Sequence, residues 1–569
     1  MSTSTVRIDF SPKRISGNAS LYKQRAPERL LFNSKQMKTI LTTIAFGIIS
    51  IILPLSVCAD EVPARKNILL IVADDLNINI GSYGNAEIQG ANAGNGGLGG
   101  TPNIDQLAKM GVLFKNAHVQ YTACNPSRAS FLSGLYPETT GVYSNQQALR
   151  TSPAGNPLGN IVTLQQYFDN HGYFTARVGK IAHEAAKFNF TGEYHWDLEV
   201  PVAGHVDIAA PPVLNPAPIP QYSSMKADGT GAVAAGASWR ATSTKDKDTK
   251  DWRSAHYVAN LLATHSTEPF FIALGFHSPH LPWVTPRPYF DWYTNNEYGG
   301  IQLPIDRVGL RQEPFDDRDD IPAYGISTGV NGTDSEYLND FFKMSPDQAR
   351  QGIAAYNASV SSMDNALGLV LQQLTALNLW ENTIVVFIGD NGFHLGEHGG
   401  LFHKATLFSE STQVPLIIAS PGSVKEQICP HPVELVGLYP TLAELAGLPA
   451  PIGVQGASFA QYQANPAAGM INPAYTVCRA YKKSPTGKNI LGKSIRTDRY
   501  RYTKWADGAP TSDANTELYD LDADPGEFNN LIVDYTSNPP LSALVTSLHA
   551  QLTAASRRAT DQTKRGVQP

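Results

Sequence analysis

The strongest constraint on the fold is a series of apolar runs that are each followed directly by polar residues. The first run, over residues 67–73, is uninterrupted and ends in Asp74 and Asp75. Such runs are typical of strands that are buried on both faces, as in a parallel α/β sheet. Four later runs repeat this design, over residues 173–178, 270–274, 383–388 and 414–419.

Helical patterns alternate with these runs. Thr163 can cap a helix over residues 164–170, and further helices are predicted over residues 251–265, 347–377 and 440–446. This alternation predicts an α/β fold with a large, mainly parallel central sheet flanked by helices. In such sheets ligands bind beyond the carboxyl ends of the strands, so we expect a site among the polar residues that follow the runs.

The pattern changes after about residue 470. Residues 494–505 and 517–521 alternate as antiparallel strands do, and residues 541–555 offer a closing helix. We therefore expect a first domain over residues 60–470 and a smaller C-terminal α+β domain with an antiparallel sheet over residues 471–569. Two stretches rich in small residues are predicted to be loop insertions, residues 86–100 and 200–250.

The front of the chain has the features of an export signal. A basic residue precedes the apolar run 41–57 and small residues follow it, so residues 37–59 are predicted to be a signal peptide. The protein is then expected in the periplasm or outside the cell, and residues 1–36 are an N-terminal extension or a mis-assigned start. The alternatives are an uncleaved membrane anchor, for which the run is short, and a lipid anchor on Cys58.

The net charge and the cysteines give further information about the kind of protein this is. The formal net charge of −6 argues against a nucleic-acid binder, although a local basic pocket can still bind an anionic substrate. Export permits a disulfide, and Cys429 with Cys478 is the pair that leaves Cys124 free. Two unpaired buried thiols are the alternative.

Oxygen-bearing side chains at two strand ends indicate a metal site. Asp74 and Asp75 follow the first run, and Asp390 and Asn391 follow the run over residues 383–388. Alone, an Asp-Asp pair after a strand is more often a helix cap than a ligand pair. A second such pair favours an oxygen cage for Ca²⁺ or Mg²⁺, because three packed carboxylates repel one another without a cation.

Basic and imidazole side chains follow other strands and loops. They are Lys180 and His183, His277 and His280, and Lys404. Each alone is more often a surface lysine or a structural histidine. Collected near a cation, they predict a pocket for a tetrahedral dianion, with imidazoles as general acid and base. His394, Glu397 and His398 follow the predicted metal loop, and we interpret them as residues that support it or line its rim.

The most specific motif is Cys124-Asn125-Pro126-Ser127-Arg128, which is followed by Leu132 and by Ser133-Gly134. A proline in the first turn and a glycine at the end predict a short helix that begins just after Cys124. Free N–H groups at the start of a helix favour an anion or an electron-rich nucleophile, so Cys124 is the candidate nucleophile.

Together these motifs resemble the type I sulfatases of the alkaline-phosphatase-like superfamily, and within them iduronate-2-sulfatase and its bacterial relatives. The resemblance runs from about residue 66 to residue 531. Besides the Cys124 motif, the stretches that carry it are Ile71–Leu76, Thr101–Asp105, Val178–Lys180, Gly275–His280, Gly389–Gly392, Leu395–Gly399 and Asp524–Pro525.

The resemblance implies a chemistry for these residues. Cys124 would be converted to formylglycine by a formylglycine-generating or anaerobic sulfatase-maturing enzyme, and its hydrated aldehyde would attack the sulfate sulfur. A divalent ion, Ca²⁺ with Mg²⁺ as the alternative, would be held by Asp74, Asp75, Asp390, Asn391 and residue 124. The other implied roles are stabilisation of the hydrate by Arg128, sulfate binding by Lys180 and Lys404, transfer of the hydrate's proton by His183, protonation of the leaving alcohol by His277, and substrate contact by His280.

The expected function is removal of sulfate from a sulfated carbohydrate, with polysaccharide fragments favoured. Asn391 stands where the iduronate enzyme has histidine, and the two loop insertions differ, so the identity of the sugar does not transfer. One alternative is a phosphodiesterase or phosphonate monoester hydrolase of the same superfamily. Another is a catalytically silent glycan-binding homologue.

Overall fold

The computed structural model describes residues 65–85, 88, 98–149, 161–183, 195–200, 237–294, 320–326, 346–480, 483–505 and 515–561. The predicted signal peptide, Cys58 and most of both predicted loop insertions lie outside these residues. Within them, no helix combines the length and the apolar character that a membrane crossing requires.

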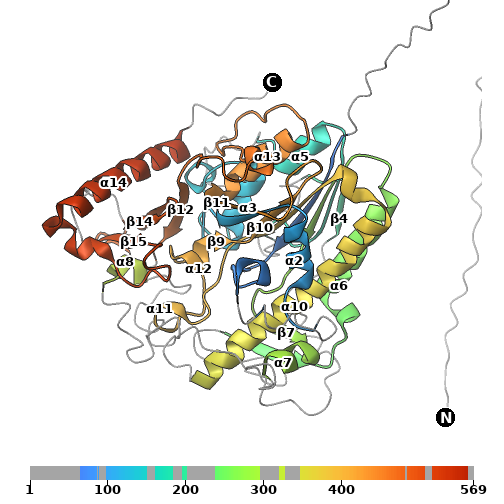
Figure 1. The fold of residues 1–569 in the computed structure, drawn as a ribbon, viewed down its shortest axis with the longest axis horizontal. Coiled ribbons are helices and arrows are strands. Elements are labelled where there is room, and N and C mark those ends of the chain that lie inside the picture. The colour runs from blue at the N-terminus through green and yellow to red at the C-terminus, as the bar shows by residue number, and fades with distance from the viewer. Residues whose placement is uncertain are drawn as a thin grey trace, which may run out of the picture. The chain divides into compact units, whose positions relative to one another are not determined.

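A nine-stranded sheet forms the centre of the fold (Figure 1). Its strands are β1 (Asn67–Ala73), β2 (Val112–His118), β3 (Phe174–Gly179), β4 (Leu198–Val200), β6 (Phe270–Gly275), β8 (Thr383–Gly389), β9 (Gln413–Val414), β10 (Leu416–Ala419) and β11 (Gln427–Glu434). They lie in the order β11-β2-β10-β8-β1-β6-β3-β4, with β9 paired to β2. β1 is parallel to both of its neighbours and is buried along its whole length, which confirms the prediction from the first apolar run.

The sheet differs from the prediction toward the β11 edge. The run over residues 414–419 is split at Pro415 into β9 and β10, because proline has no N–H to donate to a ladder. β10 is antiparallel to both β8 and β2, so the sheet is mainly rather than wholly parallel. The sequence does not predict β2 or β11, because exposed Lys115 interrupts the first and Pro430 and Pro432 interrupt the second.

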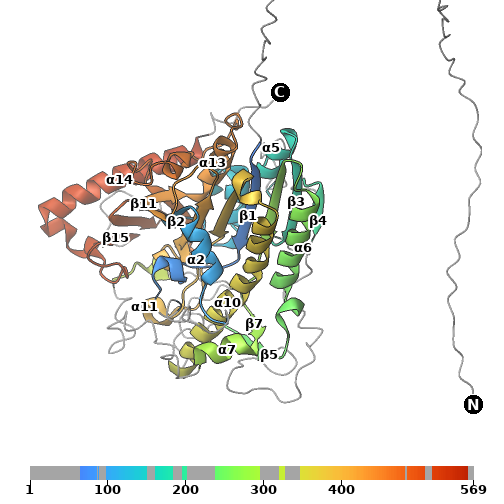
Figure 2. The ribbon, with the colours of Figure 1, turned by 45° about the vertical axis from the view of Figure 1, so that its right-hand side comes forward.

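Helices cover both faces of the sheet (Figure 2). One face carries α2 (Pro102–Lys109), α6 (Lys250–Thr264), α7 (Arg287–Thr294) and α10 (Pro346–Ala376). The other face carries α3 (Cys124–Ser133), α5 (Leu164–Asn170) and α13 (Leu438–Leu445). Leu69 and Ile71 of β1 pack into the first core and Ile68 and Leu70 into the second, as the alternation of a strand requires. The predicted helices are confirmed, with small shifts at their ends.

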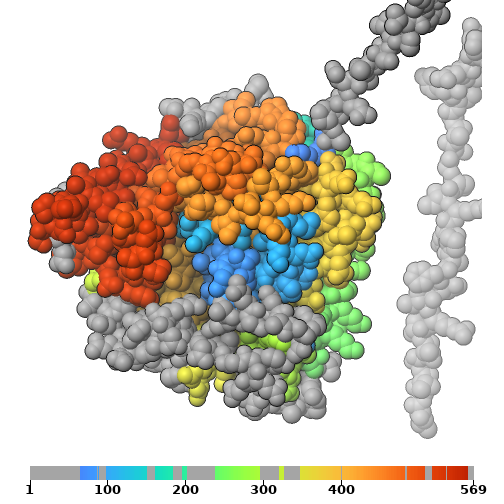
Figure 3. All heavy atoms as spheres, viewed as in Figure 1, coloured from blue at the N-terminus to red at the C-terminus, as the bar shows by residue number. Residues whose placement is uncertain are grey.

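A second sheet confirms the predicted C-terminal α+β part. Its antiparallel strands are β12 (Ala474–Arg479), β13 (Leu491–Arg496), β14 (Tyr500–Trp505) and β15 (Thr516–Asp520), in that order. The 3-10 helix η14 (Leu531–Ser537) and α14 (Pro539–Thr560) pack on it, and Figure 3 shows these red segments beside the orange ones that precede them. Arg558 donates to Glu434 at 3.1 Å and to the hydroxyl of Tyr136 at 3.0 Å, so the last helix is tied to the central sheet. The domain boundary at residues 470 and 471 stays a prediction.

The other elements are short. They are η1 (Gly81–Tyr83), α4 (Pro137–Thr140), β5 (Trp239–Thr242), η5 (Asp246–Asp248), β7 (Trp283–Pro286), α8 (Ala323–Ile326), η10 (Leu379–Asn382), α11 (Glu397–Gly400), α12 (Ser409–Thr412), η11 (Leu435–Gly437) and η12 (Ala460–Gln463). β5 and β7 form a separate parallel pair.

The expected disulfide between Cys429 and Cys478 is wrong, because both thiols are free and buried. Cys429 lies on β11 beside Phe114 of β2. Cys478 lies on β12, and its thiol donates to the carbonyl oxygen of Ala405 at 3.1 Å. The two cysteines therefore belong to different sheets and to different apolar clusters, and the alternative of two unpaired thiols is confirmed.

Gly275, the last residue of β6, allows two strand ends to approach closely. A Cβ atom on it would lie 2.1 Å from the carbonyl oxygen of Lys180, and this backbone cannot turn aside as a flexible side chain can. We expect Gly275→Ala to lower the free energy of unfolding by about 3 kcal/mol in denaturant titrations. Gly469→Ala is the matched control, because its Cβ meets nothing within 4 Å. Equal stabilities of the two variants would contradict this account.

Candidate active site

The carboxyl ends of β1 and β8 bring the predicted acidic residues together. The two strands are in register up to their last residues, so the residues that follow them are neighbours. Asp74, Asp75 and Asp390 are almost fully buried, and the backbone N–H of Asp75 donates to Asp390 at 2.9 Å. A carboxylate oxygen from each lies within 4.8 Å of the others and of the Sγ of Cys124. Two acidic pairs that are far apart in sequence thus form one cluster.

Arg128 of α3 is the counter-charge inside this cluster. Its Nε donates to Asp390 at 2.7 Å, and its Nη2 donates to Asp74 at 3.2 Å. Its Nη1 donates to the carbonyl oxygens of Lys180 at 2.5 Å and Ile181 at 2.9 Å. The side chain is fully buried. One guanidinium group therefore compensates two buried carboxylates and links the ends of β1, β3 and β8.

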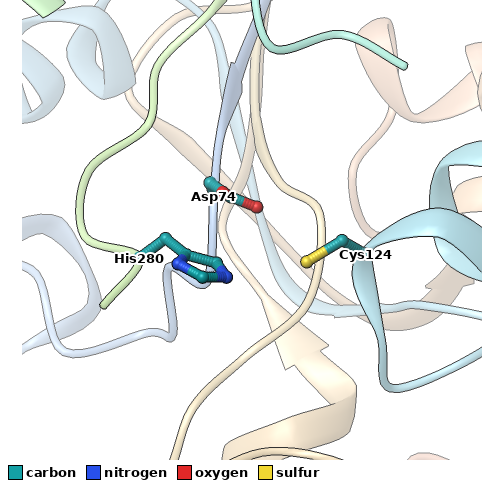
Figure 4. Close-up of side chains that lie close together, drawn as sticks. All are labelled: Asp74, Cys124 and His280. Carbon is teal, nitrogen blue, oxygen red and sulfur yellow. The ribbon is translucent and has the colours of Figure 1, made fainter. Parts of the chain in front are cut away.

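Cys124 is the first residue of α3, and its thiol faces the carboxylates. Its Sγ lies 2.9 Å from the Nζ of Lys404 and 3.6 Å from an oxygen of Asp75. Figure 4 shows Asp74 between the sulfur of Cys124 and the ring of His280. Burial, together with the charge of Asp74, raises the pKa of the thiol well above its ordinary value. An unmodified Cys124 is therefore a neutral thiol, which is a weak nucleophile.

Two lysines reach the cluster from different segments. Lys180 follows β3 and donates to Asp74 at 2.5 Å, and Lys404 donates to Asp75. Burial opposes the charged form of both lysines, but the carboxylates outweigh it and raise the pKa of each ammonium group. Burial likewise opposes ionisation of Asp74, yet Lys180 and the other cations hold its pKa well below the ordinary value. The two lysines predicted to bind sulfate are thus paired with carboxylates.

The predicted histidines surround the same cluster. The Nε2 of His280 lies 3.7 Å from Asp75, and its Nδ1 lies 2.6 Å from the carbonyl oxygen of Leu281, which assigns the proton to Nδ1. Burial, with a smaller effect of nearby Lys180, lowers the pKa of His183 to about 3. Burial also lowers the pKa of His277 below its ordinary value. All three imidazoles are therefore neutral at pH 7 in the free protein.

The surroundings of Asn391 and of the three carboxylates show whether a divalent cation suits this site. The amide nitrogen of Asn391 donates to Asp75 at 2.8 Å, while its oxygen is buried and has no hydrogen-bond partner among the described residues. Burial raises the pKa of Asp390 to about 6, and Asp74 and Asp75 add to the rise while Arg128 opposes it. Crowded carboxylates and an unsatisfied amide oxygen are suitable ligands for a hard divalent cation.

Sequence reasoning missed two residues that hold this site. The hydroxyl of Tyr356 on α10 donates to the carbonyl oxygen of Asp75 at 2.9 Å, at a residue whose φ of 64° lies in the left-handed region. Asp251 of α6 accepts from the backbone N–H of His277 at 2.8 Å. No motif marks either residue, because Tyr356 lies inside a long predicted helix and Asp251 is an ordinary acid in a first helical turn.

Comparison with known protein families identifies the family of this chain. The family profile described as Sulfatase matches residues 66–448, which is more than half of the chain. The chain belongs to the sulfatase family. A second profile, described as N-sulphoglucosamine sulphohydrolase, C-terminal, matches residues 396–558. The predicted family is confirmed, the protein is a sulfuric ester hydrolase, and sulfatases are metal-dependent in general.

Individual relatives match more than four fifths of this chain. A sulfatase of Formosa agariphila is 30% identical over 490 residues, which cover 84% of this chain and 85% of that protein. Iduronate 2-sulfatase of Mus musculus is 30% identical over 543 residues, covering 82% and 91%. Among solved structures, a 2-O GAG sulfatase has a TM-score of 0.61 at 23% identity, covering 88% and 93%. The phosphonate monoester hydrolase of Agrobacterium radiobacter has a TM-score of 0.66 at 20% identity, covering 88% and 97%, which shows the shared fold.

Removal of the buried guanidinium group of Arg128 should show how much it contributes to the stability of this sulfatase. We expect Arg128→Met to lower the free energy of unfolding by about 3–5 kcal/mol, because Asp74 and Asp390 lose their shared counter-charge. Arg287→Met, which removes an exposed pair with Asp291, is the control and should change stability by less than about 1 kcal/mol. Denaturant unfolding of the metal-free protein measures both, and losses of similar size would contradict the role given to Arg128.

Proposed function

We propose that this sulfatase hydrolyses a sulfate ester on a carbohydrate, with Cys124 converted to formylglycine as the residue that attacks sulfur. The observation that carries the proposal is the 2.9 Å contact between Cys124 and Lys404 beside the carboxylates of Asp74 and Asp75. A nucleophile, a set of cation ligands and a positive group at one point are what attack on an anionic ester requires.

The relatives support a glycosaminoglycan-like substrate. Curated relatives include iduronate 2-sulfatases of Mus musculus and Homo sapiens. Solved relatives include a 2-O GAG sulfatase and a protein in complex with its substrate D-glucosamine-2-N,6-O-disulfate. We therefore propose sulfated polysaccharide fragments, cut at the chain end, with iduronate 2-sulfate as one candidate. The predicted signal peptide over residues 37–59 supports an exported enzyme that meets such polymers outside the cytoplasm.

The electrostatics around Cys124 support its conversion. A buried thiol with a raised pKa is a weak nucleophile. Formylglycine would supply an aldehyde hydrate with two hydroxyl groups: the oxygen of one bonds to sulfur as the alcohol leaves, and loss of the proton from the other expels sulfate and restores the aldehyde. The partner that this requires is a formylglycine-generating or anaerobic sulfatase-maturing enzyme.

The metal would be held by the oxygens of Asp74, Asp75, Asp390 and Asn391, together with residue 124. Ca²⁺ is proposed, with Mg²⁺ as the alternative, because the three carboxylates and the amide all offer hard oxygens. When bound, the cation supplies a Lewis acid for a sulfate oxygen and for the attacking hydroxyl. Arg128 orients two of these carboxylates through the hydrogen bonds described above.

The lysines and histidines would then act on the substrate. Lys180 and Lys404 are each paired with a carboxylate that could instead bind the cation, so both ammonium groups would then be available for sulfate oxygens. His183 is neutral and accepts the proton of the attacking hydroxyl. His277 protonates the leaving alcohol, and His280 contacts the sugar.

The first test measures both the modification of Cys124 and the release of sulfate by the same protein. We expect the Cys124 peptide of the active protein to be about 18 Da lighter than its thiol form, and the protein to release sulfate from a panel of sulfated oligosaccharides. Cys124→Ala should lower the rate by roughly 10⁴-fold or more. Cys429→Ala, which alters a buried thiol on β11, is the control that keeps both properties. A formylglycine-bearing protein that releases no sulfate from any member of the panel would count against the proposal.

The assigned role of His277 predicts a pH dependence. Its pKa lies below the ordinary value of 6.5 in the free protein, so the protonated form is lost as pH rises toward 6.5. We expect kcat/KM to fall about tenfold per pH unit on the alkaline side, with the fall beginning below pH 6.5. His277→Gln should lower kcat/KM and flatten this limb. If the variant keeps the wild-type limb, another group is the acid.

Because the chain shares its fold with a phosphonate monoester hydrolase, the assay also tests the alternative that this protein hydrolyses phosphate diesters. That enzyme shares the fold at 20% identity, which says nothing about the reaction of this chain. Turnover of an aryl sulfate compared with a phosphate diester separates the two activities. A glycan-binding homologue would bind the oligosaccharide panel and turn over neither compound.

A further inference from the structure

A second group of metal-binding side chains lies outside the carboxylate cluster. His394, His398 and Glu410 come from the segment between β8 and β9, and both histidines are fully buried. One donor atom from each residue lies within 4.8 Å of the other two. None of the three takes part in the sulfate chemistry proposed above. Their imidazole nitrogens suit a transition metal such as Zn²⁺, whereas Ca²⁺ prefers ligands that are all oxygen.

Two of these donors already have the spacing of metal ligands. The Nε2 of His398 lies 3.4 Å from an oxygen of Glu410. Bond lengths of about 2.0–2.2 Å put neighbouring donors of a tetrahedral Zn²⁺ about 3.3–3.6 Å apart. One ring nitrogen of His394 lies no more than 4.8 Å from the other two donors, so a movement of about 1 Å would complete the set of three.

A hydrogen-bond relay fixes the tautomer of His394. The hydroxyl of Thr406 donates to Ser411 at 2.9 Å, so it accepts from the Nε2 of His394, which lies 2.7 Å away. The proton of the neutral ring is therefore on Nε2 and the lone pair is on Nδ1, which lies 4.0 Å from an oxygen of Glu397. Such an outer hydrogen bond orients most metal-binding histidines.

The second histidine is held in place by its backbone and by a ring. His398 has a φ of 50°, in the left-handed region that non-glycine residues rarely adopt. Its imidazole stacks on Phe408 with 3.9 Å between the ring centroids and 20° between the planes. Residues in such backbone conformations concentrate at ligand sites and other functional positions.

A cavity of about 640 Å³ reaches this group at Glu410. Glu410 lines it and is 20% exposed at its side chain, and Glu397 lines it beside the histidines. The wall holds four carboxylates against one lysine, one arginine and one histidine, and these residues are Glu397, Glu410, Asp498, Asp522, Lys115, Arg496 and His431. This balance favours a cation over a sulfated glycan, and the volume leaves room for a water ligand.

We propose that His394, His398 and Glu410 bind one divalent transition-metal ion, best matched by Zn²⁺, with a water from the cavity as fourth ligand. The ion braces the segment that also carries Asp390, Asn391 and Lys404, and it is distinct from the cation of the carboxylate cluster. The alternative for the same atoms is a metal-free ion pair between His398 and Glu410.

Metal titration of the whole protein tests this site without an activity readout. The protein is stripped with a chelator and returned to excess CaCl₂, which occupies the oxygen cluster, and is then titrated with ZnCl₂. We expect one Zn²⁺ equivalent per chain and a rise in Tm of at least about 2 °C. CoCl₂ in place of ZnCl₂ should give the visible absorption bands of a four-coordinate site.

Variants assign the ion to the cluster. His394→Gln and Glu410→Gln should weaken Zn²⁺ binding at least about 100-fold and abolish the Tm rise. His431→Gln, which alters a histidine of the same cavity that pairs with Asp498, should bind as the wild type does. Unchanged binding by both cluster variants would overturn the proposal, and so would a wild-type protein that takes up no Zn²⁺ or Co²⁺. The Co²⁺ spectrum of the wild type keeps the test decisive if a variant does not fold.

Discussion

The buried pairing of Arg128 with Asp74 and Asp390 is the interaction on which the rest of the site depends. Each carboxylate that leaves water loses several kcal/mol of hydration, and only a counter-charge with good hydrogen-bond geometry offsets this loss. Arg128 supplies that geometry from α3, and it also binds two carbonyl oxygens beyond β3. The acidic cluster, the helix that begins at Cys124 and three strand ends are therefore parts of one electrostatic unit.

The parallel arrangement of β1 with its neighbours explains why so much of this unit is visible in the sequence. Strands covered on both faces must be apolar along their length, so β1, β3, β6 and β8 appear as runs without any homologous sequence. Their carboxyl ends meet at one edge, which is why the polar residue after each run is a good candidate. The helix that begins at Cys124 is also predictable from local residues, because Gly134, with a φ of 70°, ends it where the pattern predicts.

Other parts of the fold depend on contacts that no local pattern encodes. β2 and β11 carry an exposed lysine and two prolines, and they become strands because they pair with each other near one edge of the sheet. The predicted disulfide rests on elimination among the cysteines, and elimination carries no information about the distance between two thiols. Tyr356 and Asp251 support the site through hydrogen bonds to backbone atoms, which tertiary packing alone creates. The catalytic roles of the residues around Cys124 stay predictions.

Because Cys124 is buried in the folded protein, an enzyme that modifies it would have to act before folding is complete. β1 cannot pair until β6 and β8 have left the ribosome, and Gln455 bonds to the carbonyl oxygen of Ala559 near the end of the chain. The thiol of Cys124 is therefore enclosed only once this sheet has formed. An enzyme that acts on this side chain would have to reach the polypeptide before it folds, so the yield of modified protein would depend on the rate of modification relative to the rate of folding.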